Sequence, residues 1–144
     1  MKPHLFFKEV ENQRILAAIR SAEDGSSSDI VVLISQKQIP DALRAAEIAF
    51  EKLRLEKSVH RNSLLIFVAP LAQTYAIVGG PALHAKVGQI WWEEMAALLG
   101  GHFKEGRFEE GLIAALEKAG RAVKLHFPSA GPQDRSGQQD LLED

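Results

Sequence analysis

Cysteine is absent from this sequence, and its absence excludes several kinds of chemistry at once. Disulfide bonds, thiolate metal sites and cysteine nucleophiles all require a thiol, so none of them is available to this chain. The absence also agrees with a reducing compartment. Together with the lack of a signal peptide and of a membrane-spanning run, it leads us to expect a cytoplasmic protein.

Long apolar runs and a strong excess of one charge are missing as well. No segment reaches the roughly 20 apolar residues of a membrane-spanning helix, and the run Leu5-Phe6-Phe7 is too short for a signal peptide. The formal net charge is −2, which gives no electrostatic case for binding nucleic acid. We therefore expect no membrane span and no nucleic acid partner.

Motifs that mark metal or catalytic sites are also absent. The five histidines are scattered without HExxH or HxH spacing, so we expect no histidine metal centre. The sequence contains no GxGxxG or GxxxxGK[ST] phosphate-binding pattern and no GxSxG serine motif. No metal ligand set and no catalytic residue is therefore predicted from motifs.

The sequence does contain enough apolar residues for one folded domain. The chain has 144 residues, 46% of them hydrophobic, and a domain of this size buries about 70% of its unfolded surface. We expect a single domain over residues 1–128. Residues 129–144 are predicted to be a disordered polar tail because they have little to bury, and Leu141-Leu142 within them is interpreted as a frayed end rather than a docking segment.

Two periodicities alternate along the domain. Apolar residues at helical spacing predict amphipathic helices. Unbroken apolar runs predict strands that are buried on both faces. The predicted helices cover residues 9–23, about 40–53, 81 to the glycine pair at 100–101, and about 108–123; the predicted strands lie at 30–34, within 61–70 and within 74–80.

The connections between the strands predict how the sheet is built. A helix joins the first two strands, and such a unit should be parallel and right-handed. The link Pro70–Gln73 is too short for a crossover, so the third strand should run antiparallel to the second. The predicted fold class is therefore α/β, a three-layer α/β/α sandwich with a small mixed β-sheet.

The turn from the third strand into the next helix is a candidate site. Gly79 and Gly80 permit a nest of backbone N–H groups, and Pro81 suits the first turn of a helix whose dipole favours an anion. His84 lies one turn further along and could reach a ligand there. A plain tight turn and a surface histidine are the alternative interpretations.

Arg61 and Asn62 precede the buried second strand. Because the hairpin reverses the chain, they should lie on the same side of the sheet as Gly79 and Gly80. Arg61 could clamp a phosphate or carboxylate, and Asn62 could hydrogen-bond a ligand. Both could instead be structural, through an ion pair and a backbone cap. Asp29, in the serine-rich turn before the first strand, belongs to an oxygen-rich loop of the kind that can hold calcium or magnesium, although a solvated turn is the default.

Several short segments of this sequence form a recognisable set. They are Ser28-Asp29-Ile30, Arg61-Asn62-Ser63-Leu64-Leu65, Ala76-Ile77-Val78-Gly79, Trp91-Trp92, the run from His102 to Leu112, and Phe127-Pro128. Together they resemble the TPM domain family, and in particular its small soluble bacterial branch. The resemblance covers roughly Lys8 to Pro128 and implies an α/β/α sandwich with a mixed sheet.

The resemblance implies more than one activity. Some plant members of the family are acid phosphatases, some bacterial members bind calcium or related cations through acidic loops, and others act in photosystem repair or receptor assembly. Asp29 stands where the family has an acid, and Arg61-Asn62 keep its pattern. Gly80 stands where relatives carry an acid, and Ser63 replaces a glycine, so one potential cation ligand is lost. We predict no cofactor, although the resemblance leaves calcium or magnesium possible.

We therefore expect a TPM-like binding module with a site for a small anion or a protein partner at the loops around Arg61 and Gly79-Gly80. The alternative is a divalent-cation-assisted enzyme resembling an acid phosphatase, in which Asp29 would act with Arg61 or His84. The candidate ligand-binding residues are Asp29, Arg61, Asn62, Gly79, Gly80 and His84.

Overall fold

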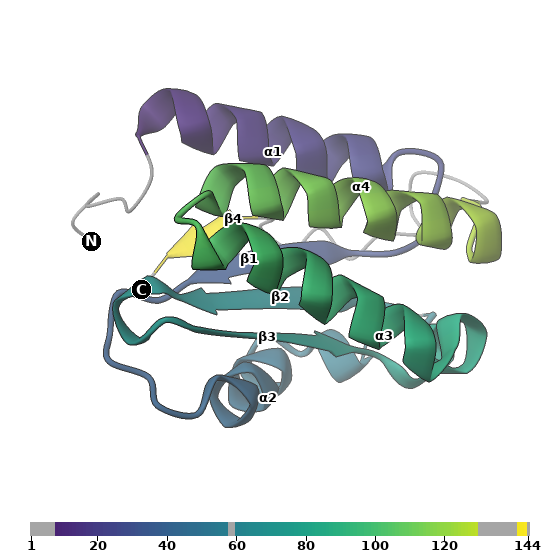
Figure 1. Ribbon diagram of the computed structural model, residues 1–144. Coiled ribbons are helices and arrows are strands. Elements are labelled where there is room, and N and C mark those ends of the chain that lie inside the picture. Colours follow the sequence, from purple (N-terminus) through teal and green to yellow (C-terminus); the bar gives the residue numbers. More distant parts are fainter. Residues whose placement is uncertain (1–7, 58–59, 130–140, 144) are drawn as a thin grey trace.

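A computed structural model describes residues 8–57, 60–129 and 141–143. Within them the chain forms three layers, with a mixed sheet between α2 on one face and α1, α3 and α4 on the other (Figure 1). The predicted α/β/α sandwich is confirmed. The helices are α1 (Glu9–Glu23), α2 (Ala42–Lys52), α3 (Pro81–Lys104) and α4 (Phe108–His126); the strands are β1 (Ile30–Ile34), β2 (Leu64–Ala69), β3 (Thr74–Gly79) and β4 (Leu141–Glu143).

The sheet has the strand order β3-β2-β1-β4. β1 and β2 are parallel, with Ile30 opposite Leu64, as the strand-helix-strand pattern predicted. β2 and β3 are antiparallel, with Leu64 opposite Gly79, which confirms the hairpin. Every residue of β1 and β2 is buried. The central strands therefore serve as scaffold, and only their ends are open to function.

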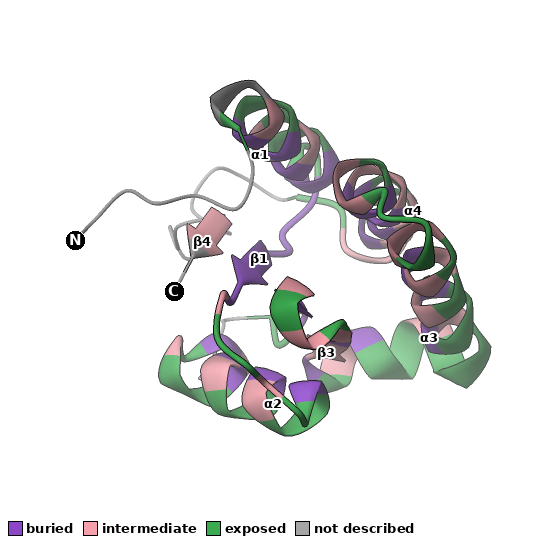
Figure 2. Cartoon of the chain, turned by 60° about the vertical axis from the view of Figure 1, so that its left-hand side comes forward, coloured by how far each residue is buried: buried purple, intermediate pink, exposed green. Residues whose placement is uncertain are grey.

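The core is divided by the sheet into two clusters. Successive strand side chains point to opposite faces, so Ile30 and Val32 face the layer of three helices whereas Val31 and Leu33 face α2. Figure 2 shows the resulting pattern, with β1 buried and the outer sides of the helices exposed. α2 begins at Ala42, two residues after Pro40, because the carboxylate of Asp41 caps it by accepting the Arg44 amide at 3.0 Å.

The strand β4 corrects the prediction of a disordered tail at three residues. Leu141–Glu143 pair in parallel with β1, opposite Val32 to Ile34. The edge of β1 would otherwise present unpaired backbone groups, and the two leucines bury apolar surface on opposite faces of the sheet, Leu141 with one core cluster and Leu142 with the other. The remaining residues of the predicted tail, 130–140 and 144, lie outside the described part of the chain.

Helix α3 is longer than its pattern predicted. It continues through Gly100-Gly101, where we expected it to end, and stops at Lys104. Position 100 is a glycine although it lies inside the helix, because the hydroxyl of Tyr75 occupies the space that a side chain would need. The pattern also did not indicate the interruption at Gly88, whose φ of 79° kinks the helix. Among the described residues, no helix combines the length and the apolar character needed to cross a membrane.

Candidate functional site

Hydrogen bonds join the glycine turn to the residues that precede β2. The amide of Gly80 donates to the carbonyl of Ser63 at 2.9 Å, and the amide of Ala82 donates to the carbonyl of Arg61 at 3.0 Å. Arg61-Asn62 and Gly79-Gly80, which are separate in the sequence, therefore lie side by side at the amino end of β2. The hairpin brings them together as the sequence predicted.

Gly80 is fixed by a close backbone approach. A Cβ atom on Gly80 would overlap the carbonyl oxygen of Arg61, which belongs to the backbone and cannot rotate away. No side chain fits at this position, including the acid that the family resemblance led us to look for. Because the amides of Gly80 and Ala82 already bind protein carbonyls, they are not available to a ligand. A ligand at this corner has to be held by other groups.

Gly79 makes room for an aromatic cluster. A Cβ atom on Gly79 would lie 2.5 Å from Cη2 of Trp92, so only glycine lets the indole pack against this strand. The ring of His84 stacks on Trp92 with a centroid distance of 4.5 Å and an angle of 28°, and Trp91 meets Trp92 edge-on at 4.9 Å. Trp92 is buried, and His84 is exposed on its outer side. The stack holds the imidazole at the beginning of α3.

Arg61 has an unusual backbone and an uncompensated charge. Its φ is 57°, in the left-handed region that side-chain-bearing residues rarely adopt. The side chain is exposed, and its Nη1 donates a long 3.4 Å hydrogen bond to the carbonyl of Glu56. A carbonyl carries no formal charge, and no ion pair joins Arg61 to a carboxylate in the described part of the chain. The guanidinium therefore keeps its full positive charge and most of its donors.

Asp29 and Asn62 are buried beside this corner. The carbonyl of Asp29 accepts the amide of Leu64 at 2.9 Å, and Nδ2 of Asn62 donates to the hydroxyl of Ser27 at 3.1 Å. Asp29 is 6% exposed and Asn62 is 1% exposed. Both residues bind other parts of the protein, so they connect the loop before β1 to the loop before β2.

The surroundings of Asp29 are rich in hydroxyl groups. The side chains of Ser28 and Ser63 are buried, and among the described residues their hydroxyls have no hydrogen-bond partner. The residues that the structure describes contain no group of three or more histidine, aspartate and glutamate side chains that could hold a metal ion. The expectation of no cofactor stays a prediction, and so does the calcium or magnesium that the family resemblance leaves possible.

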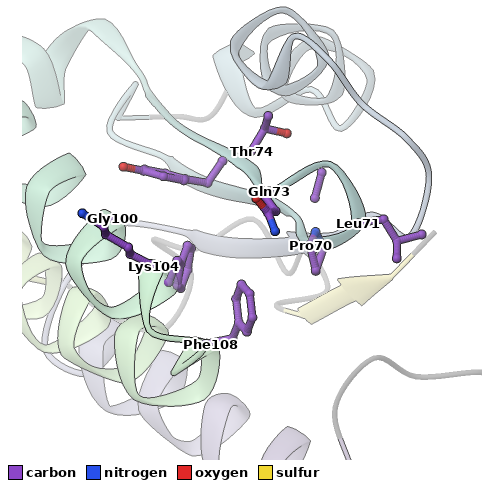
Figure 3. A pocket seen from close by; sticks show the side chains of 11 residues that line it. Pro70, Leu71, Gln73, Thr74, Gly100, Lys104 and Phe108 are labelled. Carbon is purple, nitrogen blue, oxygen red and sulfur yellow. The ribbon is translucent and has the colours of Figure 1, made fainter.

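A second feature was not anticipated from the sequence. A cavity of about 640 Å³ lies at the carboxyl end of β2, at the opposite end of the strand from Arg61 (Figure 3). None of the candidate residues lines it. The sequence carried one indirect signal, the glycine at position 100 within an apolar helical stripe, which we interpreted as a helix end.

Comparisons with known proteins agree with the fold. The family described as the TPM domain matches residues 3–122. The solved structure of the BA42 protein from the psychrophilic bacterium Bizionia argentinensis is similar to this chain at 28% identity and a TM-score of 0.86, covering 99% of each chain. The comparison with curated proteins returned no match.

Two more distant structures share the fold. The N-terminal domain of the cg2496 protein from Corynebacterium glutamicum is 16% identical with a TM-score of 0.65, over 96% of this chain and 82% of that one. The N-terminal domain of a protein from P. gingivalis is 15% identical with a TM-score of 0.60, over 87% of this chain and 83% of that one. At these identities the likeness concerns the fold alone.

Proposed function

We propose that this chain, which belongs to the TPM domain family, is a binding module that holds a small oxyanion at the amino end of β2. The ligand group would be a phosphate or a carboxylate. The side chains of Arg61 and His84 would hold it, because the glycine amides at this corner are already engaged. The observation that carries the proposal is the uncompensated charge of Arg61.

The backbone of Arg61 supports this role. The left-handed conformation costs a residue with a side chain about 1–2 kcal/mol, and such costs are often found where a residue has a functional position. Here the Ala82 amide holds the Arg61 carbonyl in place. The guanidinium is planar and presents its donors as a fork, which suits two oxygens of one phosphate or carboxylate.

His84 supplies a second group at the same corner. It follows Ala82 by two residues, and the Ala82 amide donates to the Arg61 carbonyl, so the backbones of the two residues belong to the same corner. Stacking on Trp92 limits the motion of the imidazole, which reduces the entropy that a ligand would have to remove. Asp29 and Asn62 would support the site indirectly, by holding together the loops that precede β1 and β2.

The test is a phosphate titration followed by backbone amide NMR, with two matched arginine variants. Arg54 is the natural control because it is also exposed and also left-handed, with a φ of 60°. We expect saturable shifts at Arg61, Asn62 and His84 in the parent and in Arg54→Gln. In Arg61→Gln the dissociation constant should rise about tenfold, the loss expected for a hydrogen bond to a charged group. Equal weakening in both variants, or no saturable shift in the parent, would overturn the proposal.

The same spectra distinguish the cation-dependent alternative. Calcium and magnesium should be titrated before phosphate is added. Saturable shifts at Asp29 with either cation, without any response to phosphate, would replace the anion site by a cation site. Magnesium-dependent turnover of p-nitrophenyl phosphate that disappears in Asp29→Asn would assign an enzyme instead of a binding module.

A further inference from the structure

The cavity at the carboxyl end of β2 is built from two segments that are distant in the sequence. Pro70 and Gln73 come from the link between β2 and β3, Tyr75 comes from β3, and Phe103 and Phe108 come from the junction of α3 and α4 (Figure 3). Its volume of about 640 Å³ falls within the range of small-molecule pockets, roughly 300–1,000 Å³. The cavity is therefore large enough to enclose a small organic ligand.

One wall of the cavity is aromatic. The rings of Tyr75 and Phe103 meet edge to face with centroids 5.5 Å apart, and those of Phe103 and Phe108 lie 5.0 Å apart at 35°. The hydroxyl of Tyr75 donates to the carbonyl of Ala96 at 3.0 Å, which holds this ring in place. A flat apolar ring would find aromatic faces and edges already positioned for stacking.

The polar side chains that line the cavity include hydrogen-bond donors from Gln73 and Lys104. The side chain of Gln73 points into the cavity, whereas that of Lys104 lies on its α3 side and extends away from Gln73 (Figure 3). Across the ranges that the structure describes, neither the carboxamide of Gln73 nor the ammonium of Lys104 has a hydrogen-bond or ion-pair partner. No acidic side chain lines the cavity to neutralise Lys104. Both side chains are exposed, and the only charge among the lining residues is the positive charge of Lys104, which favours a negatively charged ligand.

We propose that this cavity binds a small aromatic carboxylate. The ring would pack against Phe103 and Phe108. The carboxylate would accept hydrogen bonds from Gln73 and from Lys104, whose exposed side chain would turn toward it. β2 separates this site from the Arg61 corner by about 17 Å, from its length at 3.3 Å per residue. The inference therefore does not depend on the proposed function, and it assigns a second ligand to the opposite end of the sheet.

The experiment titrates the intact protein with naphthalene-1-acetate and follows backbone amide shifts. Two probes separate the parts of the ligand: acetate lacks the ring, and naphthalene-1-ethanol lacks the charge. We expect saturable shifts at Gln73, Tyr75 and Phe108 with naphthalene-1-acetate, and binding at least about tenfold weaker for either comparison compound. Equal affinity for the alcohol would overturn the role of the carboxylate. Shifts confined to Gly79 to His84, or no saturation, would overturn the site.

Substitutions at the rim identify the donors without disturbing the core. Lys104→Gln should weaken binding about tenfold, whereas Lys86→Gln, on an exposed lysine of the same helix outside the cavity, should not. Gln73→Gly should also weaken binding while leaving the fold intact, because Gln73 has a φ of 56° that glycine adopts freely. Equal affinities of the two lysine variants would overturn the proposal. Shifts that depend on protein concentration alone would assign the cavity to a second copy of the chain and overturn it as well.

Discussion

The hydroxyl of Tyr75 occupies the space next to Gly100 in which any larger residue would place its Cβ atom. A Cβ atom on Gly100 would be 2.5 Å from it. The same hydroxyl bonds to the carbonyl of Ala96, one turn earlier on α3. The contact sets how closely the second half of α3 approaches β3, and it forms one wall of the cavity at the carboxyl end of β2.

Gly100→Ala should lower the free energy of unfolding by about 1–3 kcal/mol, the usual cost of overpacking. Gly101→Ala is the matched control, because a Cβ atom there would meet nothing within 4 Å. That variant should be more stable by about 0.5–1 kcal/mol, since alanine is the better helix former. Urea unfolding of both variants checks the difference. In a Tyr75→Phe background the cost of Gly100→Ala should shrink, and an unchanged cost would contradict the proposed contact.

Gly80→Ala should be among the most destabilising changes at the amino end of β2, at about 3 kcal/mol, because the obstacle is the Arg61 carbonyl. Gly79→Ala meets side chains instead of backbone, chiefly that of Trp92 and, at 3.1 Å, that of Leu83. In a Trp92→Phe background, thermal unfolding should show a smaller cost for Gly79→Ala and an unchanged cost for Gly80→Ala. If Trp92→Phe reduced the cost of Gly80→Ala as much as that of Gly79→Ala, the backbone at Gly80 would have to be able to move.

Gly80→Asp addresses the cation ligand that the family resemblance implies. Because a Cβ atom does not fit at Gly80, the variant should be destabilised rather than gain a cation site. Its melting temperature should be the same with and without calcium chloride. A calcium-dependent increase that the parent lacks would show that the backbone can accommodate the acid.

The sequence predicted best those elements whose residues are buried on both faces of the sheet. β1 is apolar throughout because it is buried on both faces, and no other element type explains five such residues between turn signals. The convergence of Arg61 with Gly80 also followed from a local feature, since the short link after Pro70 forces the chain to reverse. Chemistry at that corner is harder to predict, because which amides remain free depends on the packing of the turn.

The features that the sequence did not predict depend on contacts between distant segments. Gly100 is small because Tyr75 reaches it across the structure, whereas a glycine pair after an apolar stripe ordinarily indicates a helix end. β4 consists of three residues whose order depends on the edge of β1. The cavity combines the β2–β3 link with the α3–α4 junction, and no local pattern marks such a combination.

Leu141 and Leu142 should contribute to the stability of the domain because they pack on opposite faces of the sheet. Replacing both by alanine should cost about 2 kcal/mol in urea unfolding, below the range for two fully buried leucines because both are partly exposed. Leu125→Ala is the control, since this leucine is 75% exposed and should cost less than about 0.5 kcal/mol. A double variant as stable as the parent would show that β4 does not contribute.

Arg61 and Arg54 offer a direct test of whether a strained backbone is kept for its side chain. Both have a positive φ, 57° and 60°, and glycine relieves the left-handed strain of about 1–2 kcal/mol at the cost of a more flexible unfolded chain. Arg61→Gly and Arg54→Gly should therefore both be as stable as the parent or more stable, by up to about 1 kcal/mol. Only Arg61→Gly should weaken phosphate binding in the NMR titration, by about tenfold as in Arg61→Gln, because only that guanidinium belongs to the proposed site. If both variants kept the affinity of the parent, Arg61 would owe its conformation to the hydrogen bond between its carbonyl and Ala82 alone, and the oxyanion would have to be sought elsewhere.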